Sequence, residues 1–442
     1  MKKSYFITLI MTATLSWVPS LRAQDASAGL REHIRPFGSV RSYAIFDTRD
    51  VKAGAEDMFF YVPRDYSHNL EGQDIYSNPS IKMCALTSQL GLEATGISYG
   101  GLDVSGRIEA DFYLLNGTSA SMRLRQAYVD LAWNHVGYME NKFSIRAGQA
   151  WHPMAADMPY CVNVESGSPF SPHSRSPQLM LDFTLFNGLS LTAGALYPFQ
   201  YLPTGPSGPS ANYVKYGLIP ELYAGFSFRS SHFLARAGAD FISLRPRWRT
   251  TDANYTENNP YDVGSRVYDR INMISPFAYL QFESGAFKIN AKSVFAQGGD
   301  HMQLMSGYAL YDWRDPWNYL YTPLRASVSF LSFSYGRKFR IMCMGGYHKS
   351  LGTQHNLSVN ENGYCRASDI YFFSVGSRDL AQMVRVTPTL SYNVGKLAVA
   401  LEYDNTSVQY GDVRKLDNYA RPLEDLHWIT NHRVLGVVMM SF

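Results

Sequence analysis

Residues 432–442 read HRVLGVVMMSF, and this terminal stretch decides the fold. The even-numbered positions from Val434 to Met440 are apolar or glycine, and they share the parity of the final residue, Phe442. An extended strand therefore presents one apolar face, because side chains alternate along it with a period of two. A last strand that is apolar on one face and ends in an aromatic residue is typical of transmembrane β-barrels.

The opposite end of the chain predicts export. Lys2 and Lys3 precede an apolar stretch over residues 5–18, and the small residue Ala23 follows at the expected cleavage site. This is the pattern of a secretory signal peptide, predicted over residues 1–23. We expect a short periplasmic segment over residues 24–38 and a barrel domain over residues 39–442.

Composition excludes other classes. Outside the signal, no uninterrupted apolar run reaches the roughly 18 to 20 residues that a transmembrane helix needs. Tyrosine (31), phenylalanine (25) and tryptophan (7) make up 14% of the 442 residues, as aromatic girdles at two membrane interfaces require. Loss of Lys2, Lys3 and Arg22 with the signal leaves 37 basic and 37 acidic residues, which disfavours a nucleic-acid partner.

Alternation continues through the chain. In residues 103–113, charged Arg107, Glu109 and Asp111 alternate with apolar Ile108 and its neighbours, which indicates a charged lumen and a lipid-facing exterior. Asn187-Gly188 is a strong hairpin signal, because both residues tolerate positive φ. We predict sixteen strands, near residues 39–48, 81–95, 102–115, 121–133, 142–151, 177–186, 189–198, 218–228, 232–244, 272–283, 286–296, 322–335, 338–347, 382–394, 397–408 and 430–442.

The connections alternate between short and mostly long. We interpret the short ones as periplasmic turns and the long ones as extracellular loops, including residues 49–80, 152–176, 245–271 and 348–381. The predicted fold is all-β, a closed antiparallel transmembrane barrel of about sixteen strands, with fourteen or eighteen as alternatives. One strand has unclear parity, because Arg123 and Arg125 share a face with Val129; a bulge or a subunit contact would explain this.

No motif indicates an enzyme. HExxH, Walker and GxGxxG patterns are absent from the mature sequence, and the histidines, among them His152 and His301, show no ligand-like spacing. The string GISYG at residues 96–100 matches GxSxG, but it lies between two predicted strands and not at the strand-to-helix turn that a nucleophilic serine needs. We expect no catalytic residues, no cofactor and no metal site. The acidic stretch 252–262 could bind calcium through oxygen ligands, although a polar loop is the simpler interpretation.

Arginines on the predicted inward faces are the candidate functional residues. Rings of cationic side chains select anions in pores. The alternative is that each arginine pairs with a neighbouring acid, such as Glu109, Asp111, Asp182 or Asp240, and only solvates the lumen. The predicted pore-lining residues are Arg107, Glu109, Asp111, Arg123, Arg125, Arg146, Arg236, Arg340 and Arg385.

The long loop after the fifth strand is unusually apolar for a segment in water. It carries Met154, Met158, Tyr160 and Phe170 together with four prolines. We predict that it folds into the barrel as a constriction; packing against other loops is the alternative.

Several strings resemble the DcaP-like outer-membrane porins, over about residues 39–442. They are EADF (109–112), RLRQAYV (123–129), AGQAWHP (147–153), SRSPQ (174–178) and IPEL (219–222), in the family's order. The resemblance implies a sixteen-stranded barrel, usually trimeric, that passes small negatively charged solutes such as dicarboxylates. It matches Arg123 and Arg125 to the family's RxR strand, and Arg107, Glu109 and Asp111 to the charged strand before it. The family's periplasmic coiled-coil extension has no counterpart between Gln24 and the first predicted strand.

These observations predict a passive diffusion porin in the outer membrane of a Gram-negative bacterium, exported through the periplasm and favouring small anions such as dicarboxylates. The expected partners are small anionic or neutral solutes, outer-membrane lipid and lipopolysaccharide, the barrel-assembly machinery and two further copies of the chain in a homotrimer. The alternative is a binding or adhesion protein that uses its long extracellular loops on a barrel anchor.

The four cysteines do not form a framework for a chain of this length. Cys84 and Cys343 fall on non-adjacent predicted strands, so we expect no bond between them. Cys161 and Cys365 both lie in long loops that could meet over the pore, and a disulfide between them remains open.

Overall fold

The structure is a computed structural model that describes residues 33–54, 59–115, 119–137, 141–162, 167–250, 265–315 and 318–442. The predicted signal peptide, residues 1–23, and the acidic stretch 252–262 lie outside the described residues. No helix in the described part of the chain is long and apolar enough to cross a membrane.

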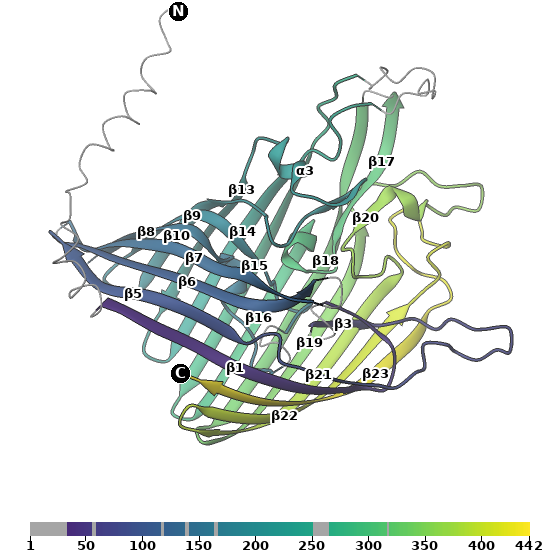
Figure 1. Ribbon diagram of the computed structural model, residues 1–442. Coiled ribbons are helices and arrows are strands. Elements are labelled where there is room, and N and C mark those ends of the chain that lie inside the picture. Colours follow the sequence, from purple (N-terminus) through teal and green to yellow (C-terminus); the bar gives the residue numbers. More distant parts are fainter. Residues whose placement is uncertain are drawn as a thin grey trace, which may run out of the picture.

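Sixteen antiparallel strands form a closed barrel, as predicted. β1 closes it by pairing with β23 on one side and with β5 on the other, and Figure 1 shows the purple first strand beside the yellow last one. The strands are β1 (Ile34–Asp47), β5 (Gln89–Tyr99), β6 (Leu102–Leu115), β7 (Ser119–Val136), β8 (Asn141–Trp151), β9 (Arg175–Thr184), β10 (Leu189–Leu196), β13 (Glu221–Arg229), β14 (Phe233–Leu244), β15 (Ile271–Ser284), β16 (Phe287–Gln297), β18 (Asn318–Gly336), β19 (Phe339–Thr353), β21 (Leu380–Val394), β22 (Leu397–Tyr410) and β23 (His427–Ser441).

The last strand has the predicted alternation. Val434, Val438 and Met440 are exposed on the outer surface, whereas Leu435 and Arg433 are buried on the inner one. The backbone of Phe442 exchanges two hydrogen bonds with Gly38 of β1, at 3.0 and 3.2 Å. The C-terminal residue therefore helps to close the barrel, and its neighbours present an apolar band outwards.

Turns and loops lie at opposite ends of the barrel (Figure 1). At the turn end, Gly188 follows Asn187 with φ +84°, and a Cβ there would lie 2.3 Å from the Arg229 carbonyl oxygen. Only glycine fits this turn without strain. At the loop end, the connections that matter below are loop 1 (residues 48–79), loop 3 (152–174), loop 4 (197–220) and loop 6 (298–306).

Short elements occupy these loops. β4 (Ser80–Cys84) continues the line of β5, and β17 (Gly307–Asp315) extends a hairpin with β18 and pairs with β20 (Ile370–Phe372). β2 (Val51–Gly54) pairs with β3 (Phe59–Pro63) in loop 1, and β11 (Thr204–Gly205) with β12 (Gly208–Pro209) in loop 4. The helices are η1 (Pro153–Ala155), α3 (Asn212–Lys215), η2 (Gly299–Met302) and η3 (Ala367–Asp369).

The structure differs from the prediction at several strand ends and in one additional strand. Among the largest shifts of a strand end are those at the start of β1 and at the end of β19, which continues to Thr353. β1 begins at Ile34 rather than residue 39, because residues 34–39 pair with Gln89–Ala94 of β5. Pro36 lies in this part of the strand and cannot donate to a ladder, so the sequence reads as non-strand there. β17 was expected to be loop, but it pairs along an extended β18.

A β-bulge explains the unclear parity of the fourth strand. Glu109 of β6 pairs with Gln126 of β7, whereas Ala110 pairs with Leu124, so Arg125 is the extra residue. The bulge shifts the parity, so Arg123 and Tyr128 both face inwards while Leu124 and Val129 face outwards. Of the two explanations that the sequence left open, the bulge is the one observed.

Candidate permeation site

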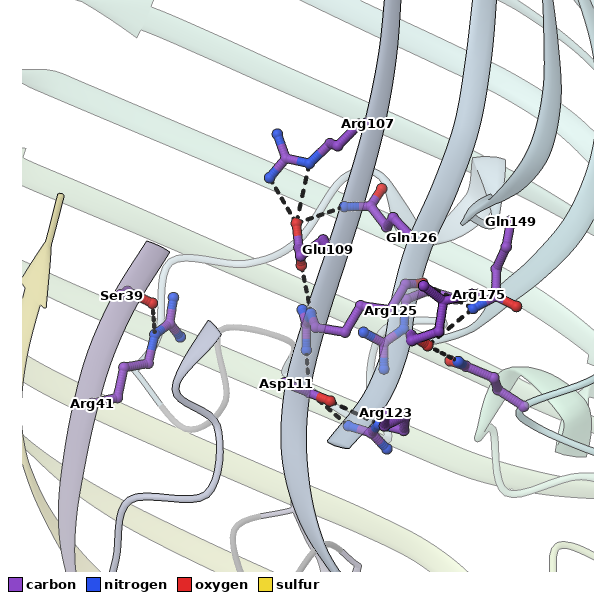
Figure 2. A network of polar contacts seen from close by, with 12 residues as sticks. Ser39, Arg41, Arg107, Glu109, Asp111, Arg123, Arg125, Gln126, Gln149 and Arg175 are labelled. Carbon is purple, nitrogen blue, oxygen red and sulfur yellow. Dashed lines mark hydrogen bonds and ion pairs between the residues drawn. The ribbon is translucent and has the colours of Figure 1, made fainter. Parts of the chain in front are cut away.

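A ladder of charged side chains follows the inner surface of β6 and β7. We call Arg107, Glu109, Arg125, Asp111 and Arg123 the arginine ladder (Figure 2). Arg107 donates to Glu109 at 2.6 Å, and Arg125 bridges the two carboxylates, at 2.5 Å from Glu109 and 2.7 Å from Asp111. Arg123 donates two hydrogen bonds to Asp111, from Nε at 2.9 Å and from Nη2 at 2.8 Å. The sequence-predicted residues of these two strands are thus one connected network.

The two signs of charge differ in exposure. The side chains of Arg107, Arg123 and Arg125 are 28%, 25% and 13% exposed, whereas Glu109 and Asp111 are 3% and 0% exposed. The carboxylates lie against the wall, where Gln126 also donates to Glu109 at 3.0 Å. A solute in the lumen therefore meets the guanidinium groups first.

Arg175 lies close to the ladder but is fully buried. Its guanidinium carbon lies 4.8 Å from the centre of the Trp151 ring, and its Nη2 donates to the Tyr201 hydroxyl at 3.1 Å. The Arg125 guanidinium lies 5.7 Å from the same indole ring. Arg175 was not among the predicted pore residues, although it falls in a string that carries the family resemblance. Arg175 is the first residue of β9 and directly follows loop 3, so the alternation of side chains along the strand did not predict its direction.

Two cavities lie on either side of the ladder. Arg107 lines one of about 740 Å³, together with Tyr128, Arg146, Trp151 and Asp182. Arg123 lines the other, of about 300 Å³, with residues of loops 1, 4 and 6 such as Tyr61, Tyr201 and Gln303. The ladder thus joins a space bounded by strands to a space bounded by the extracellular loops.

Loop 3 crosses the barrel and binds the opposite wall. Lys292 of β16 donates to the Met154 and Asp157 carbonyls at 2.6 and 2.8 Å, and Asn290 donates to the Met158 carbonyl at 2.9 Å. Further along, the Tyr160 amide donates to Ser332 of β18 at 2.9 Å, and the Val162 amide to Glu402 of β22 at 2.6 Å.

The predicted constriction residues lie inside the barrel with this loop. Met154 and Phe170 are fully buried, and Met158 and Tyr160 are partly buried. Phe170 packs over Gly346 of β19, where an added Cβ would lie 2.4 Å from the ring. A glycine on the inner face of β19 therefore provides the space that the phenylalanine occupies.

Arg385 has a different environment from the ladder arginines. It is 1% exposed and lies 3.4 Å from Asp404. Its nitrogens donate to the carbonyls of Ser168 in loop 3, at 2.8 Å, and of Phe60 and Tyr61 in loop 1, at 3.0 and 3.2 Å. It faces inwards, as predicted, but loops 1 and 3 cover it.

The remaining predicted arginines are dispersed. Arg146 forms a two-nitrogen ion pair with Asp130, at 2.7 and 2.8 Å, in the larger cavity. Arg236 pairs with Asp157 of loop 3 at 3.0 Å. Arg340 donates to Ser334 at 3.1 Å and lines a separate space beside Tyr160.

Sequence reasoning missed a buried group that includes two histidines. His152 and His301, which showed no ligand-like spacing, both contact Glu221, at 2.8 and 3.2 Å, and Asp240 lies beside them. The four residues come from four separate segments, so no local motif could have indicated this group.

No disulfide joins any of the four cysteines in the described part of the chain. Cys161 and Cys365 are both buried and form no disulfide in the described part of the chain, so the possible bond across the loops is not observed. Cys84 on β4 and Cys343 on β19 lie on non-adjacent strands, as expected.

Comparison with known proteins gives similarity in structure rather than in sequence. The outer membrane channel DcaP of Acinetobacter baumannii is 15% identical, with 92% of this chain and 97% of that chain covered and a TM-score of 0.62. OmpF of Salmonella typhi, in a complex with daunomycin, is 11% identical over 92% and 97%, with a TM-score of 0.49. OmpT of Vibrio cholerae is 11% identical over 92% and 97%, with a TM-score of 0.47. No family model and no curated protein sequence matches the chain.

The first of these similarities confirms the sequence-based fold. The chain has the barrel fold of a DcaP-like outer-membrane porin.

Proposed function

We propose that the chain is a passive diffusion porin of a Gram-negative outer membrane that favours small anions, and that it works as a homotrimer. One observation carries the anion preference: three guanidinium groups of the arginine ladder reach the lumen while Glu109 and Asp111, the carboxylates of the ladder, are buried. Arg107 also lies 3.9 Å from Glu93, which is 42% exposed, so the excess of exposed positive charge rests mainly on Arg123 and Arg125. Exposed positive charge in a narrow, low-dielectric passage attracts anions and repels cations.

Dicarboxylates suit this surface best. A guanidinium group binds a carboxylate through two parallel hydrogen bonds, which gives geometric selection as well as attraction. Arg107 and Arg123 lie at the two cavities. Arg123 binds Asp111 through Nε and Nη2, which leaves its Nη1 for a solute, and Nη1 of Arg107 lies 3.9 Å from the partly exposed Glu93. A short dicarboxylate can therefore pass from one guanidinium to the next while it stays partly neutralised.

Loop 3 supplies the narrowing that makes this charge effective. Its backbone is held by side chains of β16, β18 and β22, so it fills the side of the lumen opposite the ladder. Solutes are then confined to the side of the barrel where the guanidinium groups lie.

Current measurements in planar bilayers test the proposal. The purified protein should give discrete conductance steps, and millimolar addition of a four-carbon dicarboxylate should interrupt the open current, whereas a four-carbon diamine at the same concentration should not. The absence of steps would favour the adhesion-anchor alternative. Equal interruption by the dicarboxylate and the diamine would keep the porin and refute the anion preference.

A further inference from the structure

A group of four buried side chains lies outside the arginine ladder, where loops 3 and 6 meet the wall. Glu221 begins β13, Asp240 lies on β14, His152 follows β8 at the start of loop 3, and His301 lies in η2 of loop 6. All four residues are at most 1% exposed. The porin proposed above does not use them.

The histidine nitrogens converge on the carboxylates. His301 Nε2 lies 3.2 Å from Glu221 and 3.7 Å from Asp240, and His152 Nε2 lies 2.8 Å and 3.6 Å from the same two residues. Donor atoms of His152, Glu221 and Asp240 all lie within 4.8 Å of one another, so the two carboxylates face a common space. Ligands bonded to one tetrahedral metal at about 2.0 to 2.2 Å are separated by roughly 3.3 to 3.6 Å, and the distances of 3.2 and 3.7 Å from His301 Nε2 to the two carboxylates lie close to this range.

Hydrogen bonds fix the roles of the two rings. His301 Nδ1 donates to the Gly298 carbonyl at 3.0 Å, which leaves Nε2 facing the carboxylates, as in histidines that ligate metals. His152 Nδ1 instead accepts the Met154 amide at 3.1 Å, so its Nε2 carries the proton that it donates to Glu221. His301 is therefore a ligand candidate, and His152 is a positioning residue for Glu221.

The hydrogen bonds within this group do not satisfy all of its carboxylate oxygens. Both oxygens of Asp240 and Oε2 of Glu221 are buried with no hydrogen-bond partner in the described part of the chain. Two buried carboxylates side by side, with three of their oxygens unsatisfied, are costly. A divalent cation at the shared centre would neutralise both carboxylates and use the free oxygens.

We propose that Glu221, Asp240 and His301 bind a divalent first-row transition metal such as Zn²⁺ or Mn²⁺, with His152 orienting Glu221. Mixed oxygen and imidazole ligands favour this class over Ca²⁺ or Mg²⁺. The metal would tie loop 6 to β13 and β14 beside the root of loop 3. Loop 4 joins the same region, because the Thr204 amide donates to Asp300, the neighbour of His301.

Metal content after folding tests the proposal. Because the group is buried, the metal is added during folding: the protein is refolded in detergent with or without equimolar Zn²⁺ or Mn²⁺. It is produced without a histidine tag and dialysed against a weak chelator after refolding. Elemental analysis and thermal unfolding then measure the retained metal and its effect on stability. The native chain should retain close to one metal per chain and unfold at a higher temperature when loaded. His301→Gln and Asp240→Asn should lose the metal, and His152→Gln should weaken retention by roughly tenfold, the effect typical of an orienting residue.

Asp412→Asn is the control, because that carboxylate lies in the loop between β22 and β23 and pairs only locally, with Arg414. It should retain metal as the native chain does. A native chain that retains no metal and shows no metal-dependent change in unfolding temperature refutes the site, whether or not the variants fold. Variants that fold and retain metal equally would also refute it. Neither result would affect the conductance steps that test the porin.

Discussion

Arg123 and Arg385 both point into the barrel, but they lie in walls that serve different purposes. Arg123 is 25% exposed, binds a buried carboxylate and lines a cavity. Arg385 is 1% exposed and donates to three backbone carbonyls of loops 1 and 3. One arginine lines a cavity inside the barrel, and the other holds loops 1 and 3 against the wall.

The difference shows that inward direction alone does not make a residue pore-lining. Loops 1 and 3 cover the wall around β21 and leave the wall of β6 and β7 open. Charge on the covered wall contributes to stability, whereas charge on the open wall is available to solutes. The predictions below test this division.

The largest effect is expected at the covered wall. Arg385→Met keeps volume but removes the ion pair with Asp404 and leaves the carbonyls of Ser168, Phe60 and Tyr61 without their donor. Removing one partner of a buried charge network costs about 3 to 5 kcal/mol. Thermal unfolding of the detergent-solubilised barrel should show this loss. Arg340→Met, on the same inner surface, should change stability by less than about 1 kcal/mol, because among the described residues Arg340 hydrogen-bonds to Ser334 alone.

Strand direction could be predicted from sequence, but loop coverage could not. Period-two alternation places Arg123 and Arg385 inwards alike, because it depends only on neighbours in the chain. Whether a loop covers each one depends on contacts between Arg385 and Phe60 or Ser168, which are distant in sequence. The bulge at Arg125 is an intermediate case, since a break in alternation indicated it without fixing its position.

Shortening loop 3 between Met154 and Phe170 should raise single-channel conductance severalfold. The segment lies across the lumen and binds β16, β18 and β22, so its removal widens the narrowest point. Unitary current steps measure the change. An unaltered conductance in a folded variant would contradict the assignment of this loop to the narrowing of the passage.

A smaller and more local effect is expected at the glycine under Phe170. Gly346→Ala should destabilise the native barrel by about 1 to 3 kcal/mol, because the new Cβ would lie 2.4 Å from the ring. Gly345→Ala is a matched control at the adjacent position, where the nearest atom lies 4.0 Å away. Equal unfolding temperatures for the two variants would show that Phe170 does not occupy this place.

The weakest expected signal is thiol reactivity in the covered region. Burial raises the pKa of the Cys161 thiol. The pKa of the Cys365 thiol is raised to about 11, mainly by burial and to a lesser extent by the negative charge of Asp417. Below that pH the Cys365 thiol stays protonated, so a maleimide at pH 7 should label neither cysteine in the native barrel and both after denaturation. Mass spectrometry should recover two separate alkylated peptides; a linked pair would mean that a disulfide joins the loops.

The reversal potential in a salt gradient tests the central claim most directly. In Arg107→Gln/Arg123→Gln, Arg125 still binds both Glu109 and Asp111, so the buried carboxylates keep a partner. A unit charge at about 4 Å in water contributes about 1 kcal/mol, which corresponds to about fivefold in local anion concentration. The variant should shift its reversal potential toward cations, while Arg414→Gln, on an exposed loop, should not. An unchanged potential in the double variant would contradict the account.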